Sequence, residues 1–141
     1  VVALFGDQPE VSLPELPFRV IRAGSLHERE AIRALYRAMD CFVCPSRSDN
    51  LPNTILEAFA EGTPCAGFRI GGVPDMITEG ETGFLATPFS PASLASAIQA
   101  VLDYPNPAEM REKVRTRFAQ DYTLDRQAVR YLSLYQELVE R

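Results

Sequence analysis

Short apolar runs separated by stretches of helical periodicity constrain the fold of this chain more than any other feature. The runs are VVALFG (1–6), FRVIRAG (18–24), CFVCP (41–45), PCAGFR (64–69) and GFLATP (83–88). Near-continuous apolar strands are typical of parallel sheets that are buried on both faces, and parallel strands need crossover connections, usually helices. The pattern therefore predicts an α/β fold with a mostly parallel sheet flanked by helices.

Helix-start and helix-stop signals occupy most gaps between these runs. Ser25 and Glu28 form a capping box that predicts a helix to about Met39. Another helix is expected from Asn53 to about Glu61, with Asn53 or Thr54 as its cap and Gly62 as its stop. Further helices are expected over 73–79, from Ser90-Pro91, from Asn106-Pro107, and from about Thr123 to Glu140. Residues 7–17 contain three prolines and predict an extended link instead.

Length and charge narrow the class of protein. A chain of 141 residues is expected to form one domain, and its 46% hydrophobic content argues against disorder. The net charge of -5 disfavours nucleic acid as a partner, because phosphate backbones are held mainly by Lys and Arg. No apolar run approaches the ~20 residues that cross a bilayer. We expect a cytoplasmic protein, with the inner face of the membrane as an alternative location if a domain outside this chain binds there.

The three cysteines include a C-x-x-C pair, Cys41 and Cys44. Redox pairs of this spacing sit at a helix start, and zinc needs further Cys or His ligands nearby, whereas this pair lies in a predicted strand. We therefore interpret the cysteines as buried free thiols in a reducing cytoplasm and expect no metal site.

The most informative polar segment is SRSDNLPNTILE, residues 46–57, which places acidic Asp49 and Glu57 on either side of a predicted helix start. A helix start offers unpaired N–H groups and a partial positive charge, which suit a phosphate. Flanking carboxylates accept hydrogen bonds from hydroxyl groups. A phosphate between two polyol ends describes a nucleoside diphosphate sugar.

Residues 41–88 resemble the donor-binding core of the retaining glycosyltransferases of family 4, which have the two-domain GT-B fold, and the resemblance extends over nearly the whole chain. It implies a Rossmann-like sheet. Asp49 and Glu57 match the family's Glu-x7-Glu pair, in which the first acid contacts the transferred sugar and the second the ribose hydroxyls. Asp49 is one methylene shorter than the usual Glu. Its structural alternative is an Asx turn.

The resemblance also assigns roles to residues around this pair. Backbone N–H groups of Leu51, Asn53 and Thr54, in the loop that contains Asn50, would contact the sugar and the diphosphate. Ser46 and Arg47 follow the third apolar run, and Arg47 could partly replace the Arg and Lys that clamp the diphosphate in the family. Gly71 and Gly72 would pack beside the donor loop, and His27 lies near backbone contacts to the base. The alternatives are helix capping for Asn53 and Thr54, a solvated Arg47, and tight-turn geometry for the glycines.

The implied function is transfer of a sugar from a UDP-, GDP- or other nucleoside diphosphate sugar to a glycan or lipid-linked acceptor, with retention and without a metal. The acceptor would bind an N-terminal domain outside this chain, so the chain alone is expected to be inactive. Two alternatives are a non-catalytic donor-binding subunit of a split glycosyltransferase and a sugar-nucleotide epimerase of the same fold. A dinucleotide-binding enzyme is disfavoured because no G-x-G-x-x-G follows the first run.

The family's first strand and helix have no counterpart here, so the domain is expected to be incomplete at its N-terminal edge. In the strand order 3-2-1-4-5-6 the missing strand would separate residues 1–6 from 41–45. Unpaired inner strand edges in an apolar interior are costly. We therefore expect residues 1–6 to pair directly with 41–45, or a second copy of the chain to cover the gap as a homodimer.

Overall fold

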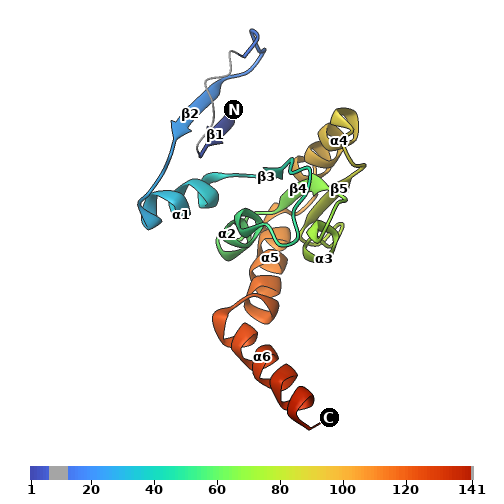
Figure 1. Ribbon diagram of the computed structural model, residues 1–141. Coiled ribbons are helices and arrows are strands. Elements are labelled where there is room, and N and C mark those ends of the chain that lie inside the picture. The colour runs from blue at the N-terminus through green and yellow to red at the C-terminus, as the bar shows by residue number, and fades with distance from the viewer. Residues whose placement is uncertain (7–12, 141) are drawn as a thin grey trace. The chain divides into compact units, whose positions relative to one another are not determined.

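The computed structural model describes residues 1–6 and 13–140, which divide into two compact units, Val1–Leu35 and Tyr36–Arg141 (Figure 1). The first unit holds the parallel strands β1 (Val2–Phe5) and β2 (Val20–Gly24). The helix α1 (Arg29–Ala38) begins in this unit, and its last residues belong to the second. Both strands lie within the predicted runs.

The start of α1 differs from the prediction. The helix begins at Arg29, and residues 25–28 carry no regular structure. The carbonyl of Glu28 accepts a hydrogen bond from the N–H of Ile32 at 3.1 Å, so the helical ladder starts after Glu28 rather than after Ser25. In the link between the strands, residues 13–16 form neither helix nor strand, as expected for an extended connection. The rest of the link prediction falls on residues 7–12, outside the described residues.

Within the first unit β1 pairs with β2, and within the second unit the strand at 42–44 pairs with the strand at 65–68. The predicted pairing of residues 1–6 with 41–45 would join the two units, and it stays a prediction. The alternative, a second copy of the chain that covers the gap, also stays a prediction.

The second unit is built on a parallel sheet of order β3-β4-β5, formed by Phe42–Cys44, Cys65–Phe68 and Gly83–Ala86. The helices are α2 (Asn53–Ala60), α3 (Val73–Met76), α4 (Pro91–Leu102), α5 (Pro107–Asp121) and α6 (Leu124–Val139) (Figure 1). All four residues of β4 are buried, as predicted for a strand covered on both faces. Part of the core joins Ala66, Phe68 and Ala86 of the sheet to residues of α4 and α5.

Most helix boundaries follow the predicted capping residues. The side-chain oxygens of Ser90, Asn106 and Thr123 accept the N–H groups of Ser93, Glu109 and Arg126. At the end of α2, Gly62 adopts a left-handed φ of 74°. Its N–H bonds the carbonyl of Phe59, and the N–H of Thr63 bonds the carbonyl of Ala58, which is a Schellman motif.

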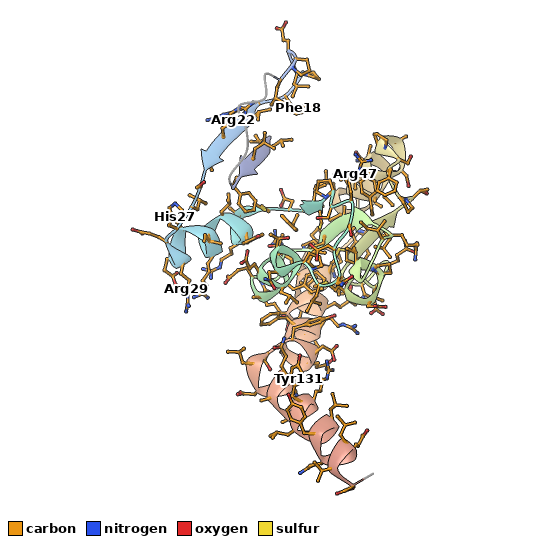
Figure 2. The ribbon with its side chains drawn as sticks, viewed as in Figure 1. Phe18, Arg22, His27, Arg29, Arg47 and Tyr131 are labelled. Atoms are coloured by element: carbon orange, nitrogen blue, oxygen red, sulfur yellow. The ribbon has the colours of Figure 1, made fainter. Side chains whose placement is uncertain are left out.

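The helix α6 has no buried residue. Tyr131 projects from it (Figure 2), with 60% of its surface exposed, and Leu132 and Val139 are also exposed. Among the described residues no helix is both long and apolar enough to span a membrane.

Two asparagines near helix starts are expected to contribute differently to the free energy of unfolding. Asn106 caps α5, so Asn106→Ala is expected to lower the free energy of unfolding by about 1 kcal/mol. Asn53 is exposed and lies inside α2 without a capping bond, so the matched Asn53→Ala is expected to change it little. Urea unfolding of both variants measures the difference. An equal loss would show that Asn53 caps its helix after all.

Candidate functional site

Loops that follow adjacent strands form the candidate site. Residues 45–52 follow β3, residues 69–72 follow β4, and residues 87–90 follow β5. Because the three strands are parallel, their carboxyl ends share one edge of the sheet, where open α/β sheets bind their ligands. We call residues 45–54, 69–72 and 87–90 the rim.

The glycine turn lies against the backbone of the loop that carries Asp49. The N–H of Gly72 donates to the carbonyl oxygen of Asp49 at 3.1 Å. A Cβ atom on Gly71 would lie 2.0 Å from that same oxygen, and one on Gly72 would lie 1.8 Å from the carbonyl oxygen of Asn50. Gly71 also has a left-handed φ of 49°. No side chain fits at either position, so the predicted packing of the glycine turn beside the loop is confirmed.

Asp49 shapes its own loop. Its Oδ1 accepts the N–H of Leu51 at 3.1 Å, which is the Asx turn that the sequence offered as a structural alternative. Leu51 was expected to present this N–H to a ligand, but the carboxylate already occupies it. The side chain of Asp49 is half-buried.

The start of α2 differs from the prediction in one respect. Pro52 is the N-cap, and no side chain makes a capping bond, so neither Asn53 nor Thr54 caps the helix. Both are exposed and occupy its first turn. Over residues 13–140, no hydrogen bond is found for the N–H of either residue, because the ladder begins with Ile55 and Leu56 donating to the carbonyl of Pro52. Two backbone donors are therefore available at this helix start.

Glu57 lies on α2 and is held by a residue that the sequence interpretation missed. The hydroxyl of Tyr36 donates to Oε2 of Glu57 at 2.9 Å. Tyr36 is fully buried, and burial, followed by its bond to Glu57, raises the pKa of its hydroxyl well above the usual 10.0. A buried tyrosine needs a hydrogen-bond partner, which is the one signal in the sequence that points to such a contact.

Arg47 contacts an aromatic ring from another loop of the rim. Its guanidinium carbon lies 5.3 Å from the ring centroid of Phe89. The ring centroids of Phe89 and Phe68 are 6.1 Å apart. Arg47 is exposed on the loop after β3 (Figure 2). Phe89 is 55% exposed and has a φ of 60°, the only left-handed non-glycine backbone in the described ranges. Strained backbone of this kind clusters at ligand sites, and the sequence interpretation overlooked Phe89.

Two further candidate residues from the sequence are Ser46 and His27. Ser46 is half-buried, and its Oγ lies 3.5 Å from Sγ of Cys44. His27 is exposed in the first unit, before α1. Arg69, also on the rim, was not singled out; it pairs with Glu79 at 3.0 Å.

All three cysteines are free thiols, but Cys41 is half-buried rather than buried as predicted. Cys44 and Cys65 are buried, and burial raises the pKa of Cys41 to about 12. Such a thiol is protonated at neutral pH and unsuited to redox exchange. The described residues contain no cluster of His, Cys, Asp and Glu side chains that could hold a metal ion.

A family model and the sequences of known proteins both match this chain. A family model described as "Glycosyl transferases group 1" matches residues 2–104. The glycogen synthase of Mycobacterium tuberculosis is 38% identical over 109 residues, which cover 74% of this chain and 26% of that protein. The curated relatives compared are matched over only 17% to 37% of their own length.

Solved structures of other proteins are similar to this chain in fold. Sucrose-phosphate synthase from Thermosynechococcus elongatus superposes with a TM-score of 0.73 and 29% identity, covering 86% of this chain and 31% of that one. The Anabaena protein HepE, in complex with UDP-glucose, gives a TM-score of 0.70 and 25% identity over 84% of this chain and 33% of that one.

The glycine turn provides a test of how the loop is held. Gly71→Ala places a Cβ atom against the carbonyl of Asp49, whereas Gly80→Ala adds one in open space at a similarly left-handed φ of 76°. The left-handed backbone alone costs about 1 to 2 kcal/mol, so Gly80→Ala is expected to lose that much in urea unfolding, and Gly71→Ala more.

Amide spectra complete this test. Gly71→Ala is expected to shift the signals of residues 49–51, and Gly80→Ala to leave them in place. Equal losses of stability, with the loop signals unmoved in both variants, would contradict the close approach.

Proposed function

Because the chain belongs to the group 1 glycosyltransferases, we propose that it is the part of such an enzyme that binds the nucleoside diphosphate sugar donor. The observation that carries the proposal is the rim itself. A helix start with two available N–H groups lies in the same loop system as Asp49 and the glycine turn, at the ligand-binding edge of a parallel sheet. The similarity to HepE, a protein solved with UDP-glucose, supports a donor of this class.

Each part of the rim has a role in this proposal. The N–H groups of Asn53 and Thr54 receive the diphosphate, with the partial positive charge of the α2 N-terminus behind them. Arg47, which lies over Phe89, adds a cation at the same edge. Glu57 accepts hydrogen bonds from the ribose hydroxyls. Oδ2 of Asp49, which has no hydrogen-bond partner among the described residues, is assigned to the transferred sugar, while Oδ1 holds the N–H of Leu51.

The chemistry that follows is transfer with retention. The bond between the anomeric carbon and the diphosphate oxygen breaks, and the acceptor oxygen bonds that carbon on the face from which the diphosphate departs. The acceptor's proton passes to the departing phosphate. N–H groups and Arg47 stabilise the negative charge that develops there, so the proposal assigns this role to the helix start and a cation rather than to a metal ion.

The proposal also names the enzyme family, the acceptor and the location. We place the chain in family 4 of the retaining enzymes, with a glycan or lipid-linked acceptor of polysaccharide synthesis that binds a separate N-terminal domain. Its free thiols fit a reducing compartment, so we propose the cytoplasm as its location.

Two variants test how much Glu57 and Arg47 each contribute to nucleotide binding. Glu57→Gln keeps the size of the side chain but loses charge-assisted hydrogen bonds to ribose, so the Kd for the best-bound of UDP, GDP and ADP is expected to rise about tenfold or more. Arg47→Ala is expected to raise it only a few-fold, because exposed ion pairs contribute little. Calorimetric titration measures both.

The matched control is Glu112→Gln, which neutralises an exposed glutamate of α5 that pairs with Arg115. It is expected to bind nucleotide like the unmodified protein. If Glu57→Gln and Arg47→Ala have equal and mild effects, Glu57 is a structural carboxylate and its assignment to ribose fails.

A further inference from the structure

The side chain of Tyr36 is fixed on several sides. The residue has no exposed surface, and its ring meets that of Phe42 edge-on, with centroids 5.4 Å apart at an interplanar angle of 69°. Its backbone carbonyl accepts the hydroxyl of buried Thr63 at 2.6 Å. The ring therefore has little freedom to move, and its hydroxyl group reaches Glu57 from a set position.

The contact has a defined direction. Because the pKa of Tyr36 lies well above 10.0, its hydroxyl keeps its proton at neutral pH and donates it to Oε2 of Glu57. A carboxylate offers two oxygens. Within the described part of the chain, Oε1 of Glu57 has no hydrogen-bond partner. One oxygen is held from the protein interior and the other is left for a ligand.

A purely structural explanation accounts for the bond only in part. The buried hydroxyl of Tyr36 needs an acceptor, and Glu57 supplies it. Phenylalanine, however, would fill the same space and make the same contact with Phe42 without needing any acceptor. Glu57, for its part, is exposed, and water could satisfy its carboxylate. What the pair adds is one fixed orientation of a carboxylate that would otherwise be mobile.

We propose that Tyr36 is a positioning residue that orients Glu57 so that its free oxygen meets the ribose hydroxyls of the nucleotide. This inference rests on the proposed function and names the residue that sets its ribose recognition. Tyr36 does not touch the ligand. It lowers the cost of ordering Glu57 when the nucleotide binds, and specificity for ribose over a deoxygenated sugar follows from that order.

The test compares the affinity for a nucleotide with the affinity for the same nucleotide without its ribose hydroxyls. Calorimetry with UDP, GDP and ADP selects the tightest binder, and the ratio of Kd values for its 2′,3′-dideoxy analogue and for the parent nucleotide measures ribose recognition. The unmodified protein is expected to prefer the parent about tenfold or more. Tyr36→Phe is expected to reduce that ratio about three- to tenfold, and Glu57→Gln to reduce it at least as far.

Two further variants separate positioning from stability. Thr82→Val removes a different buried hydroxyl, which accepts the N–H of Thr78, and is expected to lower the unfolding midpoint while keeping the full ribose preference. The double variant Tyr36→Phe with Glu57→Gln is expected to show the ratio of Glu57→Gln alone, because Tyr36 acts through that carboxylate.

The outcomes distinguish the two proposals. If nucleotides bind with a ribose preference that Tyr36→Phe leaves intact, or that Thr82→Val reduces equally, the positioning role is overturned while the donor site stands. If the unmodified protein binds nucleotides without a ribose preference, this inference also fails. Absence of binding to all three nucleotides overturns the proposed function and this inference together.

Discussion

The approach of the glycine turn to the backbone of residues 49–50 is the constraint on which the rest of the site depends. One hydrogen bond, from Gly72 to the carbonyl of Asp49, joins the loop after β3 to the turn after β4 at a separation that admits no Cβ atom. Because the loop is held there, Asp49 can close an Asx turn on Leu51, and Pro52 can start α2 with its first N–H groups uncovered. Arg47 lies on the same loop and reaches Phe89 after β5. Three strand ends are thus joined at one edge.

In our proposal the site combines recognition of an anion with recognition of hydroxyl groups, and different parts of the structure support the two. The helix start of α2 offers backbone donors whose direction is set by the helix, so it needs no side chain to bind an anion. Recognition of hydroxyl groups needs an ordered acceptor, and Glu57 is exposed on the helix surface. We propose that Tyr36 orders Glu57 from the protein interior, because a buried phenol with a raised pKa keeps its proton and donates it from a fixed position.

Local signals predicted much of this architecture. The strand runs and the caps at Ser90, Asn106 and Thr123 depend on neighbouring residues, so the sequence indicates them directly. The helix start near Ser25 was misplaced, whereas α2 begins at Asn53 as predicted but has Pro52 as its N-cap, because several residues at each start could cap the helix. Tyr36 and Phe89 were missed because their partners are distant in sequence: 21 positions separate Tyr36 from Glu57. The sequence also indicates the strand at 1–6, whose partner within the first unit is β2.

The central claim is that the rim and Glu57 bind a nucleoside diphosphate. Following backbone amide signals while UDP, GDP or ADP is added tests it most directly, because each residue reports separately. The account predicts that one nucleotide shifts the signals of residues 46–54 and of Gly71 and Gly72 selectively, with the largest changes at Asn53 and Thr54. Shifts scattered over α4, α5 and α6, or no shifts at millimolar nucleotide, would contradict it.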